Sequence, residues 1–166
     1  MGVARWSVAL LVAVVLAVVV GQAPSQAADG KAHQVMVITQ YGLVAKFKTA
    51  KCRKRKDGFD LLTKEVDGGY SLFVSIDNFD PKQDAYPVTQ GASDPFVSVV
   101  QHGSDLRYNN TNVPPFPAPG FGKIEFDKDH PKLVGVGYSH AYTHDATDAA
   151  TITGVLTCKY PKRRAR

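Results

Sequence analysis

Apolar and polar side chains alternate along most of the chain from residue 33 onward, and Gly, Pro, Asn and Asp interrupt the alternation at short intervals. A period of two places every second side chain on the same face of a β-strand. Over residues 70–77 it puts four apolar side chains on one face: Tyr70, Leu72, Val74 and Ile76. The same pattern predicts strands over residues 34–39, 43–49, 58–63, 95–101, 123–127, 132–140 and 151–158.

Helical periodicity is missing from this part of the sequence. After residue 28, no stretch of ten or more residues carries apolar side chains at helical spacing. Two Pro-rich segments, 78–95 and 108–120, are expected to be irregular, because a residue that precedes proline is pushed out of the helical region. About eight short strands separated by turns predict an all-β domain, either an antiparallel β-sandwich or an open barrel.

The first 27 residues interrupt this pattern and are predicted to be a signal peptide. Arg5 precedes an apolar run of 13 residues, Val8 to Val20, and small residues end the segment at Ser25 and Ala27. A membrane span needs about 20 residues, so the length of the run favours a signal peptide over the alternatives, an uncleaved anchor or a buried helix. We therefore expect a secreted chain that starts at Ala28, extracellular or associated with the cell envelope, with no transmembrane anchor after cleavage. The remaining parts are an N-terminal segment with the first strand (28–42), the sandwich domain (43–160) and a basic tail (161–166).

Two cysteines, Cys52 and Cys158, lie near the two ends of the predicted domain. In an oxidising compartment they are expected to form a disulfide that closes the fold. Alternation places Cys158 on the inward face with Ile152 and Leu156. Cys52, however, falls on the face opposite Leu43, Ala45 and Phe47, so a bulge or a strand end between Phe47 and Cys52 is needed to turn it inward.

The formal net charge of +5 conceals a strong segregation of charge. Residues 57–158 hold six basic and fourteen acidic side chains, whereas residues 46–56 and 159–166 hold seven and five basic side chains and no acid. A disulfide would bring these two runs together. We therefore predict an anion-binding patch whose ten members flank the cysteines: Lys51, Arg53, Lys54, Arg55, Lys56, Lys159, Lys162, Arg163, Arg164 and Arg166.

The partner that this patch favours is an anionic cell-envelope component or another polyanion. Nucleic acid is not expected, because Tyr160 is the one aromatic side chain interleaved among the ten cations of the patch, too few for base stacking. The alternative interpretation is a solvated edge, since charged edge strands also prevent sheets from pairing with each other.

Candidate chemistry adds little to this picture. His140, His144 and Asp145 are suitable metal ligands, but on an extended strand they span too great a distance for one ion. The two glutamates, Glu65 and Glu125, are expected to face solvent, and no nucleophile motif is present. The sequence therefore predicts no catalytic residue and no cofactor. A pocket protein for a lipid or small apolar ligand, lined by tyrosine and phenylalanine, is an alternative function, and an uncharacterised hydrolase is another.

The arrangement around the cysteines resembles that of small exported actinobacterial β-sandwich proteins, among them the mycobacterial lipoprotein antigens. The likeness covers residues 43–158 and consists of a signal peptide, an early strand that leads to Cys52, and a last strand that ends at Cys158. Those proteins are β-rich, disulfide-closed and without established catalysis, so the resemblance implies a surface or binding role. This chain lacks the acylated cysteine of the lipoprotein members, so the resemblance does not imply a lipid anchor.

Overall fold

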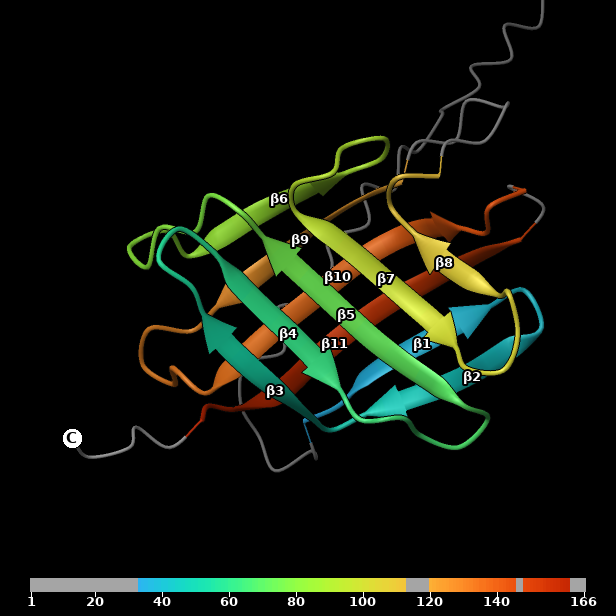
Figure 1. The fold of residues 1–166 in the computed structure, drawn as a ribbon, viewed down its shortest axis with the longest axis horizontal. Coiled ribbons are helices and arrows are strands. Elements are labelled where there is room, and N and C mark those ends of the chain that lie inside the picture. Colours follow the sequence, from blue (N-terminus) through green and yellow to red (C-terminus); the bar gives the residue numbers. More distant parts are fainter. Residues whose placement is uncertain (1–32, 113–119, 146–147, 162–166) are drawn as a thin grey trace, which may run out of the picture.

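The computed structural model describes residues 33–112, 120–145 and 148–161 (Figure 1). Within these residues the fold is all-β, as the alternation predicts, and contains eleven strands. The described residues include no apolar helix of membrane-spanning length. The strands are β1 (Val35–Thr39), β2 (Gly42–Phe47), β3 (Thr49–Lys54), β4 (Phe59–Thr63), β5 (Tyr70–Ile76), β6 (Ala85–Thr89), β7 (Phe96–Gln101), β8 (Arg107–Asn109), β9 (Phe121–Phe126), β10 (Leu133–Tyr142) and β11 (Ala149–Lys159).

The strands form two layers whose directions cross in Figure 1. Hydrogen bonds connect the nearer layer in the order β3-β4-β5-β7-β8, and the farther layer in the order β2-β1-β11-β10-β9-β6. The core lies between them, where side chains such as Leu72 and Val74 of one layer and Ile124 and Ile152 of the other are fully buried. Burial of apolar surface from both layers is the main force that holds the sandwich together.

The predicted inward faces are confirmed for the longest strands. Tyr70, Leu72, Val74 and Ile76 are all buried, as are Ile152, Leu156 and Cys158. Leu43 is an exception, because its side chain is 48% exposed. The register between β1 and β2 shifts after Val37, so that Leu43 pairs with Ile38 and turns outward while Ala45 stays inside. A local bulge of this kind cannot be recognised from alternation alone.

The predicted strand over residues 43–49 is two strands, and the break lies at Lys48. β2 ends at Phe47, and β3 begins at Thr49 in the other layer. Lys48 and Thr49 are both exposed, so the alternation changes phase and Cys52 points into the core. The expected strand end between Phe47 and Cys52 is confirmed.

Two short strands, β6 and β8, fall within or overlap the segments that we expected to be irregular. β6 falls within residues 78–95 and pairs with β9 at one end of its layer. Pro87 is tolerated there because the outer side of an edge strand has no partner to receive a backbone N–H. β8 has three residues and lies between β7 and β10. Prolines and a length of three residues hide both strands from pattern analysis.

The two layers are hydrogen-bonded to each other at two places. At the first, β11 runs parallel to β3 and pairs Thr157, Cys158 and Lys159 with Thr49, Ala50 and Lys51. This parallel pair makes the whole sheet mixed, whereas all the other strand pairings are antiparallel.

The second junction is between β8 and β10, where the register gives one pair, Asn109 with Tyr142. Side-chain hydrogen bonds supply the rest: the Asn112 amide donates to the Tyr142 carbonyl at 2.8 Å, and the Tyr108 hydroxyl donates to Asp148 at 2.8 Å. We call this junction, with Asn110 next to it, the amide join.

Candidate anion-binding surface

The predicted disulfide is present and ties the parallel pair together. Cys52 of β3 and Cys158 of β11 are 5.3 Å apart at Cα, and both are buried. Because side chains alternate along each strand, the neighbours of the two cysteines point outward. Lys51 and Lys159 are therefore register partners on the outer surface, directly above the bridge. The disulfide brings members of the two basic runs side by side, as the sequence indicates.

Three cations lie on this outer surface: Lys51, Arg53 and Lys159. We call them the basic seam. All three are exposed, and none of them forms an ion pair with a carboxylate of the described residues. Asp60 is the register partner of Arg53, but its carboxylate is held by Arg55 at 3.0 Å and by the Ser75 hydroxyl at 3.1 Å. The charge of the basic seam is thus available to an external anion.

The other described members of the predicted patch are arranged differently. Arg55 bonds to Asp60 and Asp77, and the hydrogen bond to Asp77 raises the pKa of its guanidinium. The Lys54 ammonium lies 5.6 Å from the centre of the Phe79 ring, in a cation–π contact. Lys56 is exposed in the turn after β3. Membership of a basic run therefore does not make a cation free to bind. The remaining predicted members, Lys162, Arg163, Arg164 and Arg166, lie outside the described residues.

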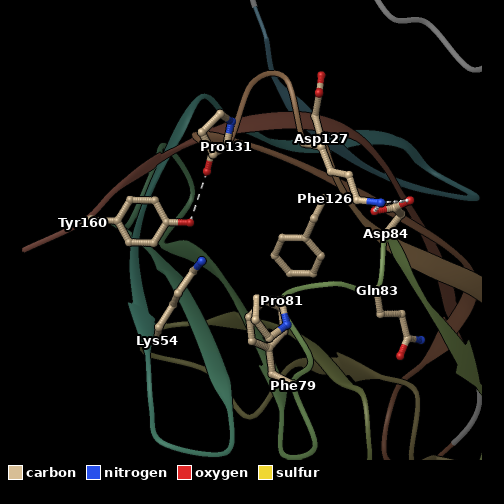
Figure 2. A pocket seen from close by; sticks show the side chains of 10 residues that line it. Lys54, Phe79, Pro81, Gln83, Asp84, Phe126, Asp127, Pro131 and Tyr160 are labelled. Carbon is tan, nitrogen blue, oxygen red and sulfur yellow. Dashed lines mark hydrogen bonds and ion pairs between the residues drawn. The ribbon is translucent and has the colours of Figure 1, made fainter.

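A pocket of about 190 Å³ opens at the end of the sandwich where Lys54 is located (Figure 2). Its floor belongs to an aromatic cluster in which Phe79 and Phe126 are 5.0 Å apart. Its rim carries charges that are already partnered: Lys128 pairs with Asp84, and Asp127 with His130. The His130 hydrogen bond lowers the pKa of Asp127. The Tyr160 hydroxyl donates to the Pro131 carbonyl on the opposite side of the opening.

A second pocket, of about 230 Å³, lies beside the basic seam and was missed by sequence reasoning. Its cationic lining is Lys46, Lys48 and Lys64. Two of these belong to the basic run before Cys52, but Lys64 is an isolated lysine in the acidic part of the sequence. The register of β3 with β4, in which Ala50 lies opposite Thr63, brings Lys64 to the other residues of the pocket. Nothing in the linear pattern points to that pairing.

The candidate metal ligands do not form a cluster. His140, His144 and Asp145 are exposed near the hairpin between β10 and β11, and Asp145 accepts a hydrogen bond from Thr143. Among the described residues, no three side chains of His, Cys, Asp or Glu are grouped to hold a metal ion. Glu65 and Glu125 are exposed, as expected, and Glu125 pairs with Lys123 at 2.7 Å. The two glutamates therefore supply no buried acid–base pair.

The largest shifts in tyrosine acidity occur at two side chains of the interior. Burial raises the pKa of Tyr138 to about 12, and its hydroxyl has no hydrogen-bond partner within the described structure. Burial and the hydrogen bond to Asp148 together raise the pKa of Tyr108. Both groups lie away from the basic seam and bear on stability rather than on binding.

Comparisons with known proteins identify no relative of this chain. No protein-family model, no curated protein and no solved structure matches the chain.

Proposed function

We propose that this chain is a secreted, non-enzymatic protein that binds an anionic cell-envelope surface or polymer through the basic seam. The observation that carries the proposal is the register pairing of Lys51 with Lys159 above the disulfide. Like charges placed opposite each other on neighbouring strands destabilise a sheet by roughly 0.2–1 kcal/mol. A pair of this kind, with no carboxylate bound to it among the described residues, is explained by a partner that supplies the negative charge.

The contrast with the other cations supports the proposal. Arg55, Lys123 and Lys128 all form ion pairs with carboxylates of the chain, at N–O distances of 2.7–3.0 Å. The described residues hold fourteen basic and fourteen acidic side chains, but the three cations of the seam form no ion pair with any of these carboxylates. Exposed charges attract an anionic surface over about one Debye length, roughly 8 Å at physiological salt.

A pocket protein for an apolar ligand is the second candidate. The opening shown in Figure 2 has an aromatic floor and supports this idea. Its volume of about 190 Å³ is below the roughly 300–1,000 Å³ of sites that enclose drug-sized ligands. The anionic surface is therefore the better supported partner.

Vesicle flotation tests the proposal. Wild-type protein is mixed with phosphatidylglycerol or phosphatidylcholine vesicles at low and high NaCl. We expect binding to the anionic vesicles alone, with a steep loss in salt. The variant Lys51→Gln/Arg53→Gln/Lys159→Gln is expected to weaken binding about a hundredfold, since each charge near an anionic membrane contributes roughly 1 kcal/mol.

The matched control removes three cations that are already paired, Arg55→Gln/Lys123→Gln/Lys128→Gln. It lowers the net charge by the same amount, and we expect it to weaken binding far less, because those charges are neutralised locally. Equal losses in the two variants would show that net charge alone drives binding and would contradict a role for the seam. Absence of wild-type binding to anionic vesicles would contradict the function for membrane surfaces, and a soluble polyanion would then be tested in the same way.

A further inference from the structure

The pocket beside the basic seam combines three cations with no acid. Lys46, Lys48 and Lys64 line it together with Phe47, Thr49 and Val66. None of the described residues that line it is a carboxylate, and none of the three lysines forms an ion pair within the described structure. Three neighbouring ammonium groups repel one another, so the site is suited to a ligand that brings negative charge. We call it the lysine pocket.

Backbone contacts hold the segments that carry the three lysines. Lys46 lies on β2, and the Lys48 carbonyl accepts a hydrogen bond from the Thr157 amide of β11 at 3.0 Å. Lys64 follows β4 and comes two residues before Val66, which forms an isolated bridge with Tyr70. The positions of the lysine Cα atoms are therefore determined by three strands of the fold rather than by a loose tail.

The nearest acid in the sequence lies elsewhere. Glu65 follows Lys64 directly, but its carboxylate is packed against the Gly68–Gly69 turn, where a Cβ built on Gly69 would lie 3.6 Å from Glu65 Oε1. Gly69 has a φ of +78°, a conformation that side-chain-bearing residues rarely adopt. The tight turn between Val66 and Tyr70 thus places Glu65 away from the described lining of the pocket and leaves Lys64 unneutralised.

Apolar residues adjoin the three lysines. Phe47 is 1% exposed and belongs to the core, and Val66 packs against the core at its edge. Charges next to an apolar, poorly polarisable wall are screened less than charges in open water. The Thr49 side chain adds a hydroxyl at the rim. An anion in this pocket is therefore attracted more strongly than an anion on the flat outer face of β3.

We propose that the lysine pocket is a binding site for a phosphate ester, such as the phosphate of a glycerol- or sugar-phosphate group. Lysine ammonium groups act as compact point charges that suit phosphate oxygens, whereas planar bidentate recognition of a carboxylate favours arginine. A volume of about 230 Å³ leaves space for the phosphate and the first carbons of its ester beside Val66. This inference rests on the proposed function, because it names the chemical group that the anion-binding surface recognises.

Calorimetric titration with glycerol 3-phosphate tests the pocket separately from the surface. We expect saturable one-to-one binding by the wild-type protein, no binding of glycerol, and several-fold weaker binding of sulfate. The variant Lys46→Gln/Lys48→Gln/Lys64→Gln is expected to lose at least about tenfold in affinity. The seam variant Lys51→Gln/Arg53→Gln/Lys159→Gln removes the same charge and is expected to stay within about twofold of wild type, because its side chains are outside the pocket.

Three outcomes overturn the proposal: no binding of glycerol 3-phosphate by the wild type, equal losses in the two triple variants, or equal affinity for sulfate. If glycerol 3-phosphate fails to bind while phosphatidylglycerol vesicles bind and depend on the seam, the pocket is wrong and the surface function stands. If glycerol 3-phosphate binds to the pocket and the vesicles do not bind, the pocket stands and the surface function is wrong. Competition by phosphatidylglycerol vesicles or by soluble poly(glycerol phosphate) then distinguishes a lipid headgroup from a polymer as the source of the phosphate.

Discussion

At the basic seam, β11 and β3 pair in parallel over three register positions, and the Cys52–Cys158 disulfide joins them. At the amide join, β8 and β10 share one register pair, and side-chain hydrogen bonds complete the contact. The first junction carries adjacent like charges on its outer surface. The second has its polar groups bonded, with Asn110 fully buried and engaged by four backbone groups.

The difference between the two junctions shows how a pair of strands can tolerate like charges that repel each other. A covalent bridge keeps Lys51 and Lys159 together whatever their repulsion, so the seam is free to present cations to a partner. The amide join has no bridge, and its geometry depends on each hydrogen bond being made. Disruption of the two junctions is therefore expected to have different consequences.

The largest effect is expected from removal of the bridge. The variant Cys52→Ala/Cys158→Ala opens a loop with a sequence separation of 106 residues. On the chain-entropy model, the free energy of unfolding should fall by about 4 to 5 kcal/mol. Urea denaturation followed by circular dichroism measures the change. Because the repulsion between Lys51 and Lys159 is then opposed by backbone pairing alone, NaCl should recover more stability in the variant than in the wild type. A loss below about 1 kcal/mol would contradict a structural role for the bridge.

A comparable loss is expected at the amide join from one isosteric change, Asn110→Asp. The Asn110 amide donates to the carbonyls of Thr89, Ala92 and Pro95, at 2.8–3.2 Å. A carboxylate directs oxygen at those carbonyls, so we expect a loss of at least about 3 kcal/mol. Asn109→Asp is the matched control, because the Asn109 Oδ1 atom only accepts, from Thr111 and Asn112, and a carboxylate does the same. Equal losses for the two variants in urea denaturation would contradict the hydrogen-bond assignment.

Alkaline pH is expected to lower the free energy of unfolding through the buried tyrosines of the interior and of the amide join, and not through the disulfide. The raised pKa values of Tyr108 and Tyr138 mean that the unfolded chain ionises first, near pH 10, while the folded chain keeps its protons. Their contribution is complete below pH 10 and is lost progressively above it, up to about pH 12 for Tyr138, with a slope of roughly 1.4 kcal/mol per pH unit for each tyrosine.

Urea denaturation at pH 9 to 11.5, with tyrosinate absorbance as a second signal, measures this loss. The variant Tyr138→Phe should show a shallower decline, because its share of the proton release is gone. The substitution also removes a buried hydroxyl that has no partner among the described residues, so no loss of stability is expected at neutral pH. An unchanged slope in the variant would show that other groups cause the alkaline loss.

The smallest effect is the most specific to the seam. The variant Lys159→Glu replaces a like-charge pair by an opposite pair with Lys51, so stability should rise by roughly 0.2–1 kcal/mol while binding to anionic vesicles falls. The control Lys128→Glu makes the same change in net charge but places a carboxylate against Asp84, so it should lower stability slightly. Thermal denaturation at low salt compares the two. A destabilised Lys159→Glu protein would contradict the view that the seam is strained by its charges.

Alternation along the chain accounts for much of the fold. The inward faces of β5 and β11 follow directly from it, because a strand turns successive side chains to opposite sides. The disulfide also follows from the sequence, and so does the need for a strand end before Cys52. β6 and β8 do not, because Pro87 and a length of three residues remove the period-two signal. The outward turn of Leu43 depends on a register shift that leaves no mark in the residue pattern.

The candidate site divides in the same way. The sequence by itself determined which segments are basic and, through the cysteines, that two of them meet. Tertiary structure decided which cations remain unpaired, because Asp60 and Asp77 approach Arg55 across neighbouring strands while Lys51 lies beside Lys159. It also decided that Lys64 joins Lys46 and Lys48 around one pocket. Local order along the chain specifies strands and their faces, whereas the charge that a side chain meets depends on strands that lie far away in sequence and are brought together by pairing.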